Sequence, residues 1–349
     1  MPFEFKKFSD IDICNPFFDS LKEDYSEFLH WFSKKKDDDA YIFSDAGEIY
    51  GFLYLKFEDE PLNDITPPLP RKQRIKIGTF KVVAHGTRLG ENFLKKAFDC
   101  ALHYGVEELY ITIFPKHTGL IKLVEKYGFG LCGTKVTANG TENVYLKSFR
   151  SQINDVITDY PIITGNNKKF VLGIYPEYHS RLFPESILKT ENPNEIIRDV
   201  SHTNSIHKVY LTKIGDTRAM KPGDTIVIYR TSDIQNRAYY RSVCTSLCAL
   251  ESINHISDYK TIDSFVSEIS TYSVFSEEEL VRFYKTKRYP IILKFTYNCA
   301  FVKRVNLQTM IETCKINQDY WGFYELTNAQ FESLIYESKI NERYIVNQT

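Results

Sequence analysis

The chain has 349 residues, of which 43% are hydrophobic, 15% aromatic and 26% charged, with both signs mixed. This length exceeds the usual size of one hydrophobic core, so we expect two globular domains, and the composition excludes a disordered chain. The formal net charge of −1 argues against a surface coated with basic residues for generic nucleic-acid binding.

The sequence contains no run of about 18 apolar residues, which a membrane-spanning helix needs. Its start, MPFEFKKFSDID, lacks the apolar stretch of a secretory signal, so we expect a cytoplasmic protein with no membrane contact. The seven cysteines form no C-x-x-C pair. Cys244 and Cys248 should face the same side of one strand, but two further ligands are missing, so we expect no metal site.

Apolar segments with the alternation of β-strands come first along the chain. The runs DAYIFSD and EIYGFLYLKFE flank a turn at Gly47 and predict a hairpin. The next stretch, PLNDITPPLPRKQ, carries four prolines, so we expect irregular structure there, because proline has no N–H to donate to a sheet. RIKIGTFKVV then predicts a strand.

A turn, a helix, a strand and a second helix follow. The turn AHGTRLG precedes a helix whose apolar residues recur with helical period: Phe93, Leu94, Ala97, Phe98, Ala101 and Leu102. LYITIF predicts a strand, and HTGLIKLVEKYGF predicts a helix that Gly128 ends in the left-handed conformation. Two last strands, GLCGTKV and ENVYLKSF, complete the unit.

The turn at 84–90 leads directly into a helix and therefore predicts an anion site. Backbone N–H groups at a helix N-terminus lack intrahelical partners and lie at the positive end of the helix dipole. Gly86 and Gly90 allow close approach of the backbone, and Arg88 adds a charge suited to phosphate. A pyrophosphate is the ligand that these features favour.

This order of elements resembles the GNAT superfamily of N-acetyltransferases, whose pyrophosphate loop has the pattern Q/R-x-x-G-x-G/A. His85 falls on the Q/R position, Arg88 on the first glycine and Gly90 on the final G/A, so two of these three positions depart from the pattern. The resemblance covers nearly all of residues 1–150. It implies a mixed central sheet with flanking helices, and acetyl-CoA as the acyl donor.

The resemblance also implies which residues bind the cofactor. Val82 and Val83 would pair with the pantetheine arm like an added strand, and backbone groups of the loop would hold the pyrophosphate. The implied cofactor-binding set is Val82, Val83, His85, Gly86, Thr87, Arg88, Leu89, Gly90 and Glu91.

The catalytic residue follows less directly from the resemblance. The ending KLVEKYGFG is similar to the family's Y-E-K-x-G-F, but the usual general-acid tyrosine is replaced by Val124, which cannot donate a proton. Tyr127 is one candidate acid for the departing CoA, with a core or capping aromatic as the alternative interpretation. His117, at the start of the same helix, is the second candidate, with a solvent-facing helix residue as the alternative.

The second half predicts an α+β domain with many strands. Expected strands are KKFVLGIYP, HKVYLTK, DTIVIYRT, AYYRSVCTSLCALESI, YPIILKF and FVKRVNL. Two helices begin with capping boxes, one from Ser276 and Glu279 and the other from Thr327 and Gln330. The polar segment 151–164 is expected to link the domains 1–150 and 165–349.

The run MKPGDTIVIYRT resembles the turn and core strand of the PUA-like superfamily, particularly its ASCH and EVE branches. The resemblance implies a β-barrel with helices that binds RNA or modified bases by stacking them on aromatic groups. We single out YPEYHSRLF as an exposed loop that mixes aromatic and cationic residues. The candidate nucleic-acid residues are Tyr178, His179, Arg181, Tyr229 and Arg230, and ordinary core packing is the alternative for each.

Together these features predict an α+β protein that joins an acetyl-CoA-dependent N-acetyltransferase to a domain recruiting a nucleic-acid or nucleic-acid-linked acceptor. An aminoacyl-tRNA is one such acceptor, and a modification enzyme and a toxin both fit. The competing hypothesis is a non-catalytic nucleic-acid-binding regulator that senses acyl-CoA. The sequence leaves open whether the protein forms a homodimer.

Overall fold

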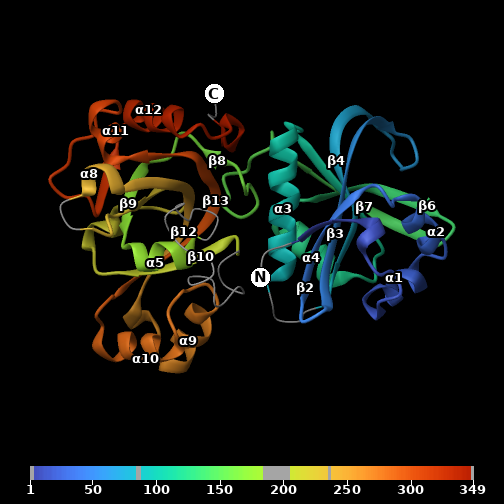
Figure 1. Ribbon diagram of the computed structural model, residues 1–349, viewed down its shortest axis with the longest axis horizontal. Coiled ribbons are helices and arrows are strands. Elements are labelled where there is room, and N and C mark those ends of the chain that lie inside the picture. The colour runs from blue at the N-terminus through green and yellow to red at the C-terminus, as the bar shows by residue number, and fades with distance from the viewer. Residues whose placement is uncertain (1–3, 84–87, 184–204, 235–236, 347–349) are drawn as a thin grey trace. The chain divides into compact units, whose positions relative to one another are not determined.

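The computed structural model describes residues 4–83, 88–183, 205–234 and 237–346. The chain divides into two compact units, Met1–Gln152 (unit 1) and Ile153–Thr349 (unit 2), and each is described by itself below (Figure 1).

Unit 1 is built on a sheet of seven strands in the order β1-β2-β3-β4-β5-β7-β6. Every neighbouring pair is antiparallel except β4 and β5, which run parallel. The strands are β1 (Glu4–Lys7), β2 (Asp39–Asp45), β3 (Glu48–Leu62), β4 (Leu69–Val82), β5 (Glu108–Ile113), β6 (Gly130–Thr137) and β7 (Gly140–Ser148). This is the mixed sheet that the family resemblance implies.

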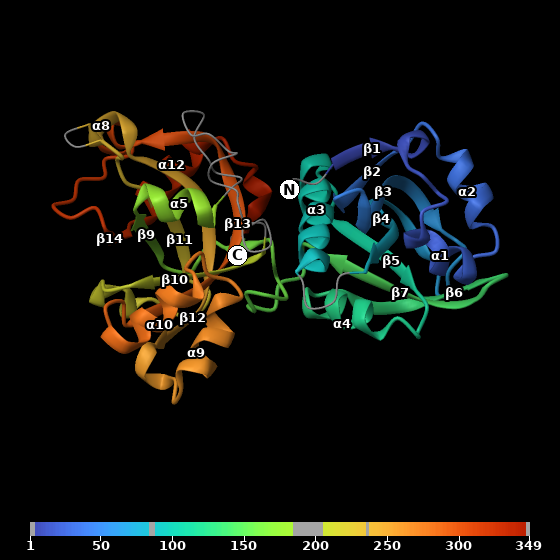
Figure 2. The ribbon, with the colours of Figure 1, turned by 60° about the horizontal axis from the view of Figure 1, so that its bottom comes forward.

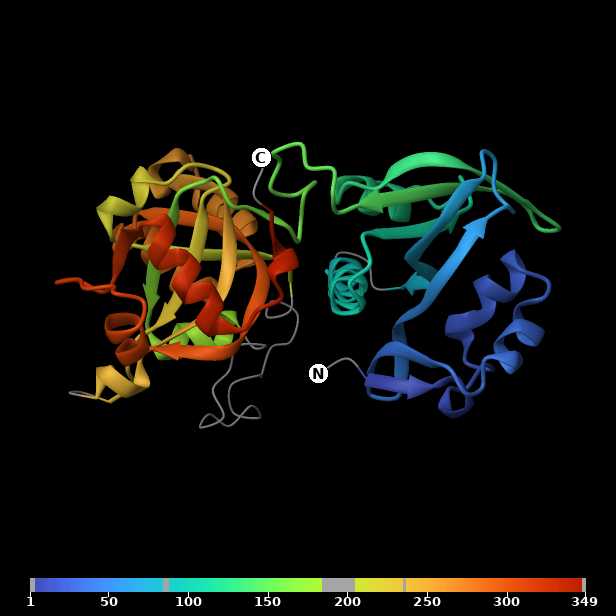
Figure 3. The same cartoon turned by 90° about the horizontal axis from the view of Figure 1, so that it is seen from above.

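Helices lie on both faces of this sheet (Figures 1 and 3). The helices are α1 (Asp19–Asp24), α2 (Phe28–Lys34), α3 (Leu89–Tyr104) and α4 (Thr118–Lys126), with short 3-10 turns at Phe8–Asp10 and Pro16–Phe18. An aromatic core joins α2 and the 3-10 turns to the sheet through Phe8, Phe18, Phe32 and Phe52. On the opposite face, the apolar stripe predicted for α3 is fully buried.

The helix ends follow their sequence signals. Gly105 ends α3 in the left-handed conformation, with a φ of 70°. Gly128 follows α4 with a φ of 83°, as predicted from its position. Both are conformations that glycine adopts without a steric penalty.

Strands β4 and β5 part before they end. Their parallel pairing runs from Arg74 with Glu108 to Ile77 with Ile111 and stops there, although β4 continues to Val82. At the same point Gly78 is an extra residue in β4, because Ile77 pairs with Leu55 and Thr79 with Tyr54 of β3. A β-bulge bends the strand that carries it. The bulge therefore accounts for the opening between the two parallel strands.

The proline-rich stretch 61–73 is more regular than predicted. β3 extends to Leu62 and β4 begins at Leu69, so most of the stretch belongs to strands. Pro61 and Pro70 fall at the register shift between β3 and β4, and neither takes a place in the pairing. Prolines are tolerated in sheets at such positions because no N–H is needed there. The prediction of irregular structure was therefore wrong for most of this stretch.

Unit 2 contains a six-stranded sheet in the order β10-β13-β12-β11-β9-β14 and a separate pair of β8 with β15. Only β9 and β11 are parallel in the larger sheet. The strands are β8 (Ile163–Thr164), β9 (Lys169–Ile174), β10 (His207–Thr212), β11 (Thr225–Arg230), β12 (Val243–His255), β13 (Ile291–Asn306), β14 (Phe323–Leu326) and β15 (Ile345–Val346).

Helices cover this sheet on both faces (Figures 1 and 2). They are α5 (Pro176–Leu182), α8 (Ala238–Arg241), α9 (Ile262–Ser270), α10 (Glu277–Thr286), α11 (Leu307–Glu312) and α12 (Asn328–Ser338), with 3-10 turns at Gly215–Ala219, Ile256–Asp258 and Glu342–Tyr344. Both predicted capping boxes are present, at Ser276 with Glu279 and at Thr327 with Gln330.

The described strands do not close into the predicted β-barrel. The six-stranded sheet is curved (Figure 3) but ends at β10 and β14. The β10 edge is covered: Val209 and Leu211 pack in one core with Phe265 of α9 and Leu280 of α10. The other edge strand, β14, has only four residues. Short or covered edges protect a sheet from further pairing without closure.

Three further expectations for unit 2 differ from the structure. The predicted strand 238–253 begins with helix α8, and the predicted loop YPEYHSRLF contains helix α5, which starts at Pro176 as proline favours. Cys244 and Cys248 lie in cores on opposite faces of the sheet, because the bulge at Thr245 inverts the alternation between them.

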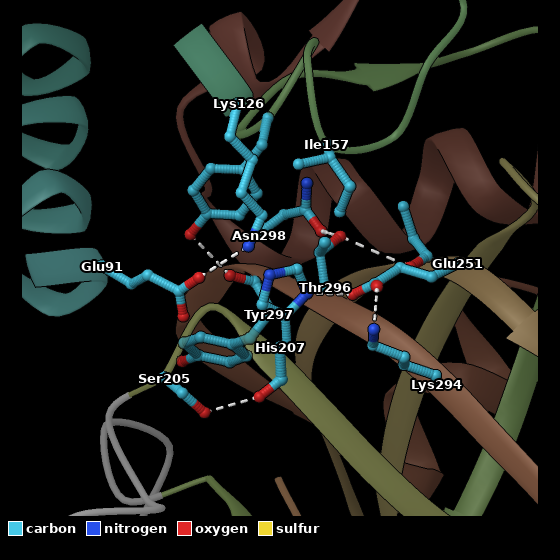
Figure 4. Close-up of polar contacts among 12 residues, drawn as sticks. Glu91, Lys126, Ile157, Ser205, His207, Glu251, Lys294, Thr296, Tyr297 and Asn298 are labelled. Carbon is cyan, nitrogen blue, oxygen red and sulfur yellow. Dashed lines mark hydrogen bonds and ion pairs between the residues drawn. The ribbon is translucent and has the colours of Figure 1, made fainter. Parts of the chain in front are cut away.

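The segment expected to link the domains belongs partly to the core of unit 2. Tyr160 and Ile163 are buried, and the Tyr160 hydroxyl donates to the Tyr297 carbonyl at 2.9 Å. The side chain of Asn298 donates to the Pro161 carbonyl at 3.0 Å and accepts from Thr296 at 2.9 Å (Figure 4).

A methyl group at Gly78 should destabilise unit 1. A Cβ there would lie 2.8 Å from Cδ1 of the buried Tyr54 ring, so we expect Gly78→Ala to lower the free energy of unfolding by about 1–3 kcal/mol. At Gly119 of α4 a Cβ meets nothing within 4 Å, so Gly119→Ala should be neutral or stabilising by up to about 1 kcal/mol. Urea unfolding of both variants tests this, and equal stabilities would contradict it.

Candidate active site

Two helices begin next to the carboxyl ends of the parallel strands in unit 1. Helix α3 begins at Leu89, after β4 ends at Val82, and α4 begins at Thr118, after β5 ends at Ile113. In sheets with parallel strands, ligands bind outside the carboxyl ends, and helix N-termini there attract anions. The opening between β4 and β5 lies at this same edge. The fold therefore brings a gap in the sheet and two helix N-termini together.

The backbone of β4 offers hydrogen-bonding groups along the opening. Val83 N–H donates to the Tyr50 carbonyl of β3 at 3.0 Å. Because successive residues of a strand point their N–H and C=O groups to opposite sides, those of Val82 and Phe80 point away from β3. Among the strands that the structure describes, none pairs with this side of β4 beyond Ile77. Val82 thus has the orientation expected for pairing with a ligand, whereas the N–H of Val83 is already bonded within the sheet.

The predicted pyrophosphate loop is described only in part. His85, Gly86 and Thr87 lie outside the described residues. Arg88 is the N-cap residue of α3, and no side chain caps the helix there. Leu89 packs into the core with 5% of its surface exposed. The side chain of the N-cap residue therefore leaves the backbone N–H groups of the first turn of α3 uncapped.

Gly90 has a packing role that its sequence position did not reveal. A Cβ at Gly90 would lie 3.0 Å from Cδ2 of Leu123, so the residue permits close approach of α3 to α4. The absence of a side chain at Gly90 therefore allows the first turn of α3 to pack closely against α4.

Glu91 and Tyr127 form a buried polar contact between α3 and the end of α4. The Tyr127 hydroxyl donates to Glu91 Oε1 at 3.0 Å. Lys126 Nζ donates to the same oxygen at 2.7 Å (Figure 4). Tyr127 is 0% exposed and its ring packs 6.3 Å from that of Phe98. These contacts correspond to the alternative interpretation of Tyr127, a core aromatic. Glu91, predicted to present its backbone to a ligand, directs its side chain into this contact.

His117 is placed at the edge of the sheet with an acidic partner. It is the N-cap residue of α4, and its Nε2 lies 3.0 Å from Oδ2 of Asp24 at the end of α1. Lys116 forms an ion pair with the other oxygen of Asp24. The side chain of His117 is 43% exposed. The structure thus gives His117 both accessibility and a carboxylate that orients its ring.

A second polar contact lies near the same edge and was missed by sequence reasoning. Tyr25 donates to Oε1 of the buried Glu142 on β7 at 2.8 Å, and Thr112 of β5 donates to the same oxygen at 3.3 Å. Burial and the charge of Glu142 both raise the pKa of Tyr25. The three residues come from distant parts of the chain, so no local sequence signal marks them.

Three of the candidate nucleic-acid residues of unit 2 have structural roles. The Arg181 guanidinium donates to the Val274 carbonyl, and the Tyr178 ring packs 5.2 Å from Phe275. Tyr229 is buried in the core that packs against α11 and α12. These contacts match the alternative interpretation of core packing.

The other two candidates, His179 and Arg230, lie on the face of that sheet opposite Tyr229, which is also the face covered by Tyr178 and Arg181 of α5. Alternation along β11 places Arg230 with Ile226 and Ile228, in the core that contains Leu182 and Phe183 next to α5. His179 of α5 is fully buried, with its Nε2 2.8 Å from the Thr245 hydroxyl. The structure therefore separates the five candidates between two faces.

None of the helices that the structure describes is long and apolar enough to cross a membrane. The seven cysteines, all within the described parts of the chain, form no disulfide bonds, and Cys244 and Cys248 are among the buried ones. Within the described residues, no cluster of His, Cys, Asp and Glu side chains could hold a metal ion.

Comparison with known proteins gives two classes of similar structure. No protein-family model matches the chain, and no curated protein matches its sequence. Solved structures with similar folds include acetyltransferases and an ASCH protein.

Three of these structures illustrate the likeness. The ASCH protein from Zymomonas mobilis is 12% identical, with 48% of this chain and 94% of that chain covered and a TM-score of 0.32. The IAA acetyltransferase from Bacillus cereus is 15% identical, with 42% and 98% covered and a TM-score of 0.32. Arabidopsis thaliana Naa50, in complex with a bisubstrate analogue, is 19% identical, with 31% and 72% covered and a TM-score of 0.25. These values are too low to define a family or a function for this chain.

Loss of the Tyr127 hydroxyl should affect stability more than turnover. Tyr127→Phe removes a buried hydrogen bond to the Glu91 carboxylate, so we expect the free energy of unfolding to fall by about 1–3 kcal/mol. A general acid would instead cost about 10²-fold or more in kcat. Tyr104→Phe, at a side chain that is 59% exposed, is the control. A large fall in kcat for a Tyr127→Phe protein of unchanged stability would restore the catalytic role.

Proposed function

We propose that unit 1 is an acetyl-CoA-dependent N-acetyltransferase of the GNAT type, and that unit 2 recruits a nucleic-acid or nucleic-acid-linked acceptor. The observation that carries the proposal is the parting of the parallel strands β4 and β5 beside the N-terminus of α3. A gap lined by backbone groups suits an extended ligand that carries amides, and a helix N-terminus suits its phosphates.

The residues of β4 and α3 fit this donor. The backbone groups of Phe80 and Val82 that point away from β3 would pair with the pantetheine amides as an added strand would. The N–H groups of the first turn of α3, from Leu89 to Glu91, would hold the pyrophosphate, with Arg88 next to them. When bound, the donor would supply a thioester whose acyl C–S bond breaks as the acetyl group forms an amide with the acceptor amine, and CoA would leave as the thiol.

His117 is the side chain we assign to proton transfer. Because the Asp24 carboxylate can only accept hydrogen bonds, a neutral His117 that bonds to it carries its proton on Nε2. The lone pair is then on Nδ1, which can take a proton from the acceptor amine. Asp24 holds the ring in this orientation in the way that a carboxylate orients a general base.

Glu142 and Tyr25 would act on the acceptor rather than on the donor. A buried carboxylate near the opening favours a cationic ammonium group, and Tyr25 and Thr112 hold that carboxylate in place. We therefore assign Glu142 to binding the amine before it loses its proton.

The alternative function, an acyl-CoA sensor without turnover, keeps one specific observation in its favour. Val124 of α4 is 1% exposed and stands where the GNAT resemblance implies a tyrosine acid, and Tyr127 is buried. Release of CoA in the presence of total tRNA or cell extract supports the enzyme. Tight acetyl-CoA binding without release of CoA supports the sensor.

A negative side chain at the start of α3 should abolish acetyl-CoA binding. Gly90→Glu would add a negative charge to the first turn of α3, beside the proposed pyrophosphate site, so calorimetry should detect no binding by the folded variant. Gly90→Ala makes the same contact with Leu123 without the charge, and its affinity should stay within about threefold because the Leu123 side chain can move. Unchanged affinity of a folded Gly90→Glu protein would show that the loop is wrongly assigned.

Removal of the His117 imidazole should slow turnover without weakening donor binding. For His117→Gln we expect kcat to fall by about 10²-fold or more, because a positioned base is lost, and the Kd for acetyl-CoA to stay the same. His103→Gln, at an exposed residue in the last turn of α3, is the matched control. An acceptor amine found by turnover screening serves for the assay, and equal kcat values for the two variants would exclude His117 as the base.

A further inference from the structure

The bulge in β12 aims a hydroxyl at α5. Ile228 of β11 pairs with Ser246 and Tyr229 pairs with Cys244, so Thr245 is the extra residue. Its hydroxyl lies 2.8 Å from Nε2 of His179 and 3.4 Å from the Ile228 carbonyl. Bulges redirect side chains and are frequent beside binding sites. The bulge therefore leaves Thr245 outside the pairing with β11, with its hydroxyl in contact with α5.

Two arginines come to the same end of the sheet. Arg230 closes β11 and pairs with Val243 of β12, and on the other side of β12 Cys244 pairs with Val305 of β13, next to Arg304. Arg230 is 2% exposed, while Arg304 is only partly buried. Arg304 is therefore the arginine of this pair that solvent can reach.

The electrostatic environment of this cluster is positive. Burial and the charges of Arg230 and Arg304 lower the pKa of His179 to about 3, so the imidazole is neutral at physiological pH. The nearby carboxylate of Asp233 bonds through both oxygens to Arg241, each at 2.6 Å, and lies 3.9 Å from Arg230. The same positive potential that disfavours an imidazolium favours a bound anion.

The Nδ1 atom of His179 is the evidence for a ligand at this cluster. This atom is buried and has no hydrogen-bond partner among the residues that the structure describes. Buried polar atoms are normally paired, so such an atom requires an explanation. When the Thr245 hydroxyl donates to Nε2, the ring proton lies on Nδ1, which can then donate to an oxyanion.

We propose that His179, Thr245, Arg230 and Arg304 form a binding site for a phosphate oxyanion, carried by a free nucleotide or by an RNA strand. The planar guanidinium groups of the two arginines match the geometry of phosphate oxygens. The site deepens the proposed role of unit 2 and rests on it only for the source of the phosphate.

The test titrates the full-length protein by calorimetry with inorganic phosphate, 5′-AMP and a short RNA oligonucleotide. Arg304→Gln should weaken binding by about tenfold or more, because a charge-assisted hydrogen bond is lost. Lys303→Gln is the matched control, since this neighbouring side chain is 54% exposed and pairs with Glu337; its affinity should change by less than about twofold.

A second pair of variants distinguishes loss of the site from loss of folding. Thr245→Val removes the hydroxyl at constant size and should weaken binding, whereas Thr245→Ser keeps the hydroxyl and should bind like the parent. Circular dichroism compares their folding. Binding of phosphate or 5′-AMP with this pattern supports the site with a free nucleotide as the source, and the same pattern seen only with RNA supports it with the strand as the source.

The failures of the two proposals are distinguishable. RNA binding that is unaffected by Arg304→Gln overturns this site and leaves the nucleic-acid role of unit 2 intact. Phosphate binding that depends on Arg304, without any RNA binding, supports the site and overturns that role. If no probe binds, or if Lys303→Gln weakens binding as much as Arg304→Gln, the phosphate site is overturned.

Discussion

The parallel pairing of β4 with β5 in unit 1 is the constraint on which its candidate site depends. Parallel strands cannot be joined by a tight turn, so β4 must be followed by a crossover, and helix α3 provides it. The crossover places the N-terminus of α3 at the carboxyl end of β4, where the two strands part. Gly78 makes the parting local, because the bulge there bends β4 against the buried ring of Tyr54.

In both units a β-bulge places polar groups at one end of the sheet. In β4 the extra residue is a glycine, and the result is a length of backbone whose hydrogen-bonding groups face an opening. In β12 the extra residue is Thr245, and the result is a side chain turned toward a buried histidine. One inserted residue changes the face of every residue that follows in a strand. A single bulge therefore changes which side chains reach a site.

Burial distinguishes Tyr127 from His117 as candidates for proton transfer in unit 1. Glu91 and Tyr127 are buried and bonded to each other, which makes them part of the contact between α3 and α4. His117 has a comparable carboxylate partner in Asp24 but remains exposed. Two residues of one helix region that look alike as candidates in the sequence therefore differ in whether a substrate can reach them.

The sequence by itself determined the separate strands of unit 1, the buried stripe of α3 and the capping boxes of unit 2, because periodicity and caps are local properties of the chain. Only the tertiary structure decided the open sheet of unit 2, the burial of Tyr127 and the meeting of Asp24, Tyr25, His117 and Glu142. The physical reason is that bulges, covered edges and contacts between distant segments depend on which residues pack against each other, and no local pattern encodes that choice.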